Sequence, residues 1–300
     1  MLPFREILLT DRPAFQKALE ASPFPNSEMT FASLWMWRSV WLCTVHIADD
    51  AIFIREHQPQ TADPAHILPV LTQHPLAPHL RRIMDDFHHR CIPFHMRSID
   101  ESYRRRLEDE CPGWFTFEAD ENFFDYVYDT ADLTTLAGRK YHGKRNHIAQ
   151  FLSRYQGQYR EMTEADAPAC MNLYDRWAQG RSNTDELAQE RRVIGDALAN
   201  LSALTMRCGA IIIDGRVEAF SLGERVRDTA IIHTEKANTE FEGLYAYMNQ
   251  QFAQHAFGDT RLINREEDMG IEGLRRAKSS YHPSARVVKY IARPVEEAPC

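Results

Sequence analysis

Three acidic residues stand in a row near the C-terminal end of the sequence, between a predicted strand and a predicted helix. Asn264 ends the strand RLIN, and Glu266, Glu267 and Asp268 follow in the turn before a helix over 271–282. Closely spaced carboxyl groups raise one another's pKa, so one of the three can act as a general base near neutral pH. Acids before a helix N-terminus also serve as ordinary capping residues. The residue types by themselves leave both interpretations open.

The residues around these acids add further candidates. Gly270 and Gly273 allow a ligand to approach the backbone closely. Arg275 and Lys278 lie three residues apart on one face of the predicted helix, where they can bind a phosphate, a carboxylate or the acids upstream. Glu235, near the end of a predicted strand, is a second candidate base. An ion pair at the edge of the sheet explains Glu235 equally well.

The basic stretch GRKYHGKRNH forms a second candidate site, because the chain as a whole has a formal net charge of −8. With a helix predicted over 141–155, Lys140, Lys144 and His147 share a face that is distinct from the apolar one. Two glycines interrupt the stretch, although a plain solvated helix has no need of helix-weakening residues. We therefore expect an acidic ligand here, with a solvated charged face as the alternative. The expected contacts are Arg139, Lys140, Lys144 and Arg145, with Tyr141 able to stack on a base.

The composition is that of an ordinary globular chain. With 300 residues, of which 44% are hydrophobic, it can form one large domain or two medium ones. No apolar run approaches the roughly 20 residues that cross a bilayer, and the N-terminus does not resemble a secretory signal. The six cysteines form no CxxC pair, and the histidines show no recognisable metal-ligand spacing. We expect a cytoplasmic protein without integral membrane insertion, disulfides or a bound metal.

The predicted elements of the second half follow a distinctive order. A strand and two helices precede a meander of three antiparallel strands, and a helix, a strand, a helix and a final strand over 286–292 follow. Asp214-Gly215 is a strong hairpin signal within the meander. This order resembles that of the GNAT acyltransferase fold, and the first half shows a blurrier version of it. We therefore predict an α/β (α+β) chain with two tandem GNAT-like domains, 1–150 and 151–300, each with a mixed, mostly antiparallel sheet flanked by helices.

Two motifs carry a more specific resemblance. They are YDTADLTTLAGRKYHGKRNHIAQF, over 128–151, and INREEDMGIEGLRRAKSSYHP, over 263–283. Together with the tandem order of elements, they resemble a soluble bacterial family of unknown function that is related to the C-terminal catalytic domain of phosphatidylglycerol lysyltransferase. The resemblance covers essentially the whole chain, but it does not extend to the multi-span membrane region of the lipid-modifying enzymes.

The resemblance implies an activity like that of the Fem-type peptidyltransferases, which move an aminoacyl group from aminoacyl-tRNA onto an amine or hydroxyl acceptor. It implies tRNA as a partner and a small molecule, a lipid head group or a peptide as the acceptor. The basic stretch and the C-terminal motif are then expected to share a cleft between the two halves. The sequence does not indicate the oligomeric state.

The loop expected to bind the acyl donor differs from that of an ordinary acetyltransferase. In a GNAT domain the pyrophosphate of coenzyme A meets the loop that starts the helix after the central strands. That loop here, KANTEFEGLYAY, contains Gly243 but lacks the usual Arg/Gln-x-x-Gly-x-Gly/Ala signature. This absence favours aminoacyl-tRNA or another donor over acyl-CoA. The alternatives are a conventional acetyl-CoA-dependent N-acetyltransferase and a non-catalytic module that binds an anionic ligand or RNA.

Overall fold

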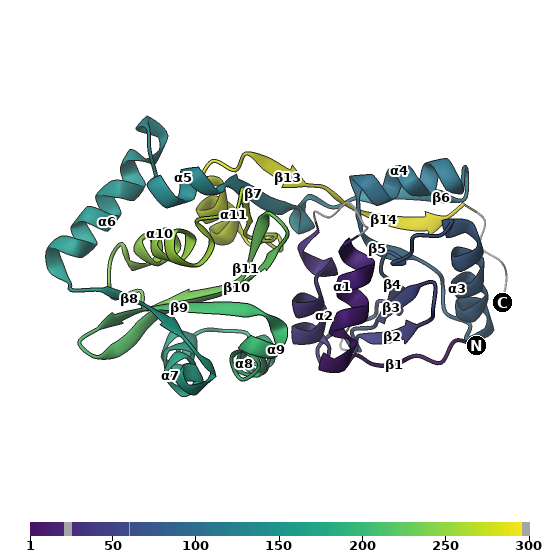
Figure 1. Cartoon of the computed structure of the whole chain (residues 1–300), viewed down its shortest axis with the longest axis horizontal. Helices are drawn as coiled ribbons and strands as arrows, with labels where there is room; N and C mark the ends of the chain where they lie inside the picture. The colour runs from purple at the N-terminus through teal and green to yellow at the C-terminus, as the bar shows by residue number, and fades with distance from the viewer. Residues whose placement is uncertain (21–25, 60, 296–300) are drawn as a thin grey trace. The chain divides into compact units, whose positions relative to one another are not determined.

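Two separate sheets organise the chain in the computed structural model (Figure 1). The structure describes residues 1–20, 26–59 and 61–295. Within these residues each sheet contains seven strands, helices flank both sheets, and most neighbouring strands are antiparallel. The architecture confirms the expected fold class of two α/β units with mostly antiparallel central sheets.

The first unit contains Met1–Phe124 and Val287–Cys300. Its strand order is β1-β2-β3-β4-β5-β14-β6. Val45 and Ile54 face each other across the β2–β3 hairpin, and both are buried. The strands and helices are β1 Arg5–Glu6, α1 Arg12–Glu20, α2 Phe31–Trp37, β2 Thr44–Ile47, β3 Ile52–Glu56, β4 His66–Ile67, α3 Leu76–His89, β5 Met96–Asp100, α4 Glu101–Glu110, β6 Phe115–Ala119 and β14 Lys289–Pro294.

The second unit contains Asp125–Arg286, and its strand order is β13-β7-β12-β11-β10-β9-β8. Helices α7 and α8 lie on one face of this sheet, and α10 lies on the other, where α5 and α6 contact it (Figure 1). The elements are β7 Asp125–Asp129, α5 Thr130–Thr135, α6 His142–Arg154, β8 Gln158–Met162, α7 Ala167–Ala178, α8 Thr184–Leu198, α9 Leu201–Leu204, β9 Met206–Ile213, β10 Arg216–Val226, β11 Thr229–Ala237, α10 Leu244–Phe257, β12 Leu262–Asn264, α11 Glu272–Ser279 and β13 Ala285–Val287.

The short strand β12 pairs with β11 only at the beginning of β11. Residues 229–231 pair in parallel with 262–264, after which β11 continues along β10. The other strand stays with β7, because the N–H of Arg265 donates to the carbonyl of Tyr126 at 2.9 Å. Asn264 fixes this departure: its side chain donates to Asp125 and accepts from the N–H of Glu266, both at 2.8 Å. The divergence leaves the last residues of β11 without a strand neighbour on that side within the described sheet.

The division of the chain differs from the expected boundary at residue 150, which lies within α6. The expected final strand over 286–292 is two strands, β13 in the second sheet and β14 in the first. β14 inserts between β5 and β6 and hydrogen-bonds to both. Each sheet therefore contains a strand that the order of elements assigned to the other half. Backbone N–H and C=O groups in a sheet need hydrogen-bond partners, and these partners can come from segments far apart in the sequence.

Other global features follow from the described residues. No helix among them combines the length and the apolar character that a membrane span requires. No group of three or more His, Cys, Asp or Glu side chains among them is placed to hold a metal ion. The five cysteines described in the structure are free thiols, four of them buried.

Candidate functional site

Polar side chains from several elements converge where β11 and β12 separate. β11 supplies alternate residues that point to the α10 side of the sheet, the segment after β12 supplies two more, and α6, α10 and the turn after α11 add one each. We call this group the strand-split cluster; its members are Lys144, His233, Glu235, Asn249, Arg265, Glu266 and Tyr281.

Glu235 is the carboxylate at the centre of the cluster. Its oxygens accept from the side-chain nitrogen of Asn249 at 3.2 Å and from Nη2 of Arg265 at 3.3 Å. Two buried atoms beside it, Nη1 of Arg265 and Oδ1 of Asn249, find no hydrogen-bond partner in the described part of the chain. A buried polar atom without a partner is costly, so a donor and an acceptor here are available to a bound molecule.

Lys144 brings a second cation to the same place. Its Nζ lies 3.9 Å from the ring centre of Tyr281 and donates to Oγ of Ser280 at 2.7 Å. Burial lowers the pKa of Lys144, the charge of Arg265 lowers it further, and the pKa comes to about 8 despite the opposing effect of Glu235. Two cations held close together form a binding site for an anion, since an anion relieves their mutual repulsion.

His233 is enclosed between two carboxylates. Its Nδ1 lies 2.7 Å from Glu266, and its Nε2 lies 3.1 Å from Glu224. Burial lowers the pKa of His233, but the hydrogen bonds and charges of the two carboxylates outweigh it and raise the pKa to about 10. The ring therefore carries a proton at neutral pH and donates to both carboxylates. Glu266 is engaged in this structural triad, which corrects its expected role as a free general base.

Asp268 is a structural residue and not a base near neutral pH. Its carboxylate is fully buried and accepts from the hydroxyl of Tyr126 at 2.6 Å and from Nε of Arg275 at 2.9 Å. Burial raises the pKa of Asp268, but the hydrogen bonds from Arg275, Tyr126 and the backbone outweigh it and lower the pKa to about 2. Neighbouring acids were expected to raise this pKa. The carboxylates of Glu266 and Asp268 instead contact different partners, and the hydrogen bonds to Asp268 dominate its pKa.

The remaining candidates of the C-terminal motif mainly build the turn. The N–H of Gly270, whose φ is +73°, donates to Asp268 at 2.9 Å. Nζ of Lys278 donates to the carbonyl of Arg265 at 2.7 Å and also to that of Glu267. Burial lowers the pKa of Lys278. With Asn264 holding the turn as described above, these residues support the backbone that carries Arg265.

Only part of the basic stretch reaches the cluster. Arg139 is exposed, and Lys140 pairs with Asp132 at 2.8 Å. Tyr141 is fully buried and donates to the carbonyl of Tyr281 at 2.8 Å, so its ring is not available to stack on a base. Nη1 of Arg145 donates to the carbonyl oxygens of Leu136 and Gly138, both of which lie just after α5. Lys144 is the residue of this stretch that joins the cluster.

The basic stretch and the C-terminal motif both lie in the second unit, so their contacts are internal to it. Sequence reasoning missed Arg265, His233, Asn249 and Tyr281. Arg265 and Tyr281 lie inside the quoted motif, and His233 stands two residues before Glu235 on the same strand face, which is a signal that alternation offers. Nothing in the local pattern distinguishes Asn249.

The loop before α10 lies against α6. Gly243 has a φ of +88°, and a Cβ at this position would collide with the carbonyl oxygen of His147. The ring of Phe241 in the same loop contacts Tyr155 with centroids 4.8 Å apart. Helix α6 therefore packs closely against the loop that starts α10.

The comparisons with known proteins agree with this fold. The family described as "Phosphatidylglycerol lysyltransferase, C-terminal" matches residues 20–293. The chain belongs to this family. A curated relative, an uncharacterised protein of Mycoplasmoides gallisepticum, is 19% identical over 175 residues, so the match spans 58% of this chain but only 57% of that protein.

Solved structures place this member of the lysyltransferase C-terminal family among several related folds. A conserved protein of unknown function from Bacteroides thetaiotaomicron is 32% identical, with a TM-score of 0.90, over 99% of this chain and 100% of that one. L-PGS from Bacillus licheniformis is 12% identical over 96% and 93%, with a TM-score of 0.63. FemX is 8% identical over 97% of both chains, with a TM-score of 0.56. A tandem GNAT protein from the clavulanic acid pathway reaches 0.52 at 10% identity over the full length of both chains, which supports the tandem GNAT-like fold.

Proposed function

We propose that this protein transfers an aminoacyl group from aminoacyl-tRNA onto an amine or hydroxyl acceptor. The observation that carries the proposal is the strand-split cluster. It combines the carboxylate of Glu235, an unpartnered N–H of buried Arg265 and the half-buried ammonium of Lys144. These are the group types that acyl transfer requires, namely a proton acceptor and donors for a developing oxyanion.

Each group has a defined role in the reaction. Glu235 accepts a proton from the acceptor nitrogen or oxygen as this atom attacks the ester carbonyl carbon. Nη1 of Arg265 and Nζ of Lys144 donate to the oxyanion that forms. The new bond between acceptor and acyl carbon replaces the bond between that carbon and the ribose oxygen, and the proton returns from Glu235 to the departing ribose hydroxyl.

The choice of tRNA as the donor rests on two supports. The family is named after a lysyltransferase, and the resemblance of this chain to that enzyme implies an aminoacyl-tRNA donor. The loop before α10, KANTEFEGLYAY, lacks the signature with which GNAT domains bind the pyrophosphate of coenzyme A, and it packs closely against α6 at Gly243. The acceptor is proposed only by class, as a small molecule, a lipid head group or a peptide, and the reaction is proposed to occur in the cytoplasm, where aminoacyl-tRNA is made.

The test uses bulk tRNA charged with radiolabelled amino acids and acceptor fractions of small molecules, lipids and peptides. We expect Glu235→Gln to reduce transfer about 100-fold while tRNA binding changes less than threefold, because removing one acid–base group costs 10²–10⁴ in rate. Glu118→Gln, which alters an exposed carboxylate of the first unit, is the matched control and should retain full transfer.

Two results would contradict the proposal. If Glu235→Gln transfers at the wild-type rate, the base assignment is wrong. If acetyl-CoA raises the melting temperature and supports transfer while charged tRNA does neither, the protein is a conventional acetyltransferase.

A further inference from the structure

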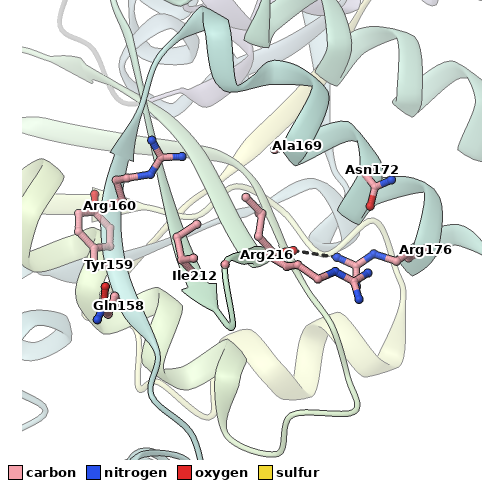
Figure 2. A pocket seen from close by; sticks show the side chains of 10 residues that line it. Gln158, Tyr159, Arg160, Ala169, Asn172, Arg176, Ile212 and Arg216 are labelled. Atoms are coloured by element: carbon pink, nitrogen blue, oxygen red, sulfur yellow. Dashed lines mark hydrogen bonds between the residues drawn. The ribbon is translucent and has the colours of Figure 1, made fainter.

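A cavity of about 670 Å³ lies in the second unit on the α7 side of the sheet, whereas the strand-split cluster lies on the α10 side (Figure 2). The edge strand β8 and its neighbour β9 form its floor, α7 forms one wall, and the turn into β10 closes it. The ten residues that line it are Gln158, Tyr159, Arg160, Ala169, Asn172, Arg176, Ile212, Gly215, Arg216 and Val217.

The charge of this lining is one-sided. It contains three arginines, and none of the ten described lining residues carries a carboxylate. Figure 2 shows Arg160 rising from β8, Arg216 from the start of β10 and Arg176 from α7 around the same hollow. In a chain with a formal net charge of −8, such a grouping creates a local positive potential against the overall field.

The nearby carboxylates do not cancel this charge. Glu218 is buried and pairs with Arg176 at 2.9 Å, whereas Nε of Arg216 lies 3.8 Å from it, so one carboxylate serves two guanidinium groups. Asp166 pairs with Arg160 at 2.9 Å but also accepts from the N–H of Thr163, which caps the turn before α7. One positive charge is therefore left in excess at the cavity.

The hydrogen-bonding capacity is also incomplete. Nε of Arg176 is buried and has no hydrogen-bond partner among the described residues. The side chains of Arg160 and Arg216 are 53% and 62% exposed, so both can turn toward a ligand without disturbing the core. The side-chain amides of Gln158 and Asn172 supply neutral donors and acceptors at the same place.

We propose that this cavity binds a phosphate-bearing ligand of about nucleotide size, through Arg160 and Arg216 with Arg176 behind them. Guanidinium groups bind phosphate in a bidentate manner, and the volume lies within the range of small-molecule sites, well above what a lone inorganic phosphate needs. The apolar face of Ile212 offers a surface for the organic part of the ligand. The phosphate can belong to a free nucleotide or to one nucleotide of an RNA chain, and the inference does not depend on the proposed transfer reaction.

The experiment measures binding of AMP, inorganic phosphate and deacylated bulk tRNA to the full chain by calorimetry and filter binding. The test variant is Arg160→Gln with Arg216→Gln. The matched control is Arg225→Gln with Arg261→Gln, which removes two exposed arginines of the same unit that likewise lie near carboxylates. A melting temperature within 2–3 °C of wild type checks that each variant folds.

A loss of AMP affinity of at least about tenfold in the test variant, with less than a twofold loss in the control, supports a site for a free phosphorylated ligand. If tRNA affinity alone falls, and the slope of log K against log salt decreases by about 1.5, the phosphate belongs to RNA. If the test variant matches its control with all three probes, or if none of the probes binds the wild type, the inference is wrong.

Discussion

Lys144 differs from the other cations of the basic stretch because the fold places it half-buried beside Arg265 and against the ring of Tyr281. Lys140 and Arg145, by contrast, satisfy local carboxylate and carbonyl groups. Charge density along the sequence therefore indicates the segment, while burial distinguishes Lys144 from the other cations within it.

We predict that the contribution of Lys144 to transfer depends on pH. Because its pKa lies near 8, its positive charge is present below pH 8 and is lost as the pH rises through that value. The kcat for transfer from charged tRNA should therefore fall above pH 8 in the wild type, because the oxyanion loses a charged donor. Lys144→Arg keeps a permanent charge and should give a flatter profile, and Lys144→Gln should lower kcat about tenfold at pH 7. Parallel profiles for wild type and Lys144→Arg would contradict this role.

His233 should make the stability of the fold depend on pH as well. Its pKa rises from 6.5 to about 10 on folding, so the folded state holds the proton more tightly. The stabilisation is fully present below pH 6.5 and is lost as the pH rises toward 10, at about 1.4 kcal/mol per pKa unit as an upper limit. Unfolding in urea between pH 6 and 10 should show a smaller pH dependence for His233→Gln than for wild type. Equal slopes would show that the ring is not charged in the folded state.

Among the elements, α6 has a structural role in packing that its basic sequence does not indicate. Its backbone packs against the loop before α10, and Gly243 makes this contact possible. The same helix carries Lys144 to the strand-split cluster. One element thus contributes a residue to the cluster and packs against the loop that starts α10.

We predict that Gly243→Ala lowers the free energy of unfolding by at least about 2 kcal/mol, because the positive φ and the carbonyl of His147 both oppose a Cβ. Gly273→Ala is the matched control. Gly273 lies within α11 with open space around it, so alanine there should be neutral or stabilise by up to about 1 kcal/mol. Chemical denaturation measures both. A loss of equal size in the two variants would show that the α6 contact is unimportant.

At the scale of the whole molecule, each half of the sequence contributes one strand to the sheet formed mainly by the other half. β7 leaves the first half to pair with β12, and β14 returns to lie between β5 and β6. The stability of the first unit should therefore depend on residues close to the C-terminus. Lys289 adds to this dependence, since its buried Nζ pairs with Glu28 at 2.5 Å.

We predict that truncation after Val288, which removes β14, unfolds the first unit while the second keeps its protection from hydrogen exchange. The missing strand leaves two neighbours with unpaired backbone groups in the interior of the sheet. Truncation after Val295 retains every strand of the described chain and serves as the control. Hydrogen exchange read by mass spectrometry separates the two units. Unchanged protection of β5 and β6 in the shorter chain would contradict the prediction.

The sequence by itself determined the element types, the GNAT-like order and the region of the candidate site. Hydrophobic periodicity and turn residues are local, so α3, α4, α6 and the β2–β3 hairpin could be recognised without coordinates. The motif around Glu266 could be recognised because its residues are contiguous in the sequence.

Only the tertiary structure decided which of these residues meet. Asp268 and Glu266 acquired partners from distant strands, which made them structural, while Glu235 was left beside an unpartnered atom of Arg265. The boundary between the units likewise depended on long-range strand pairing. Burial and hydrogen bonds between distant segments set both the charge state of a side chain and its freedom to bind a ligand, and these quantities are absent from local sequence pattern.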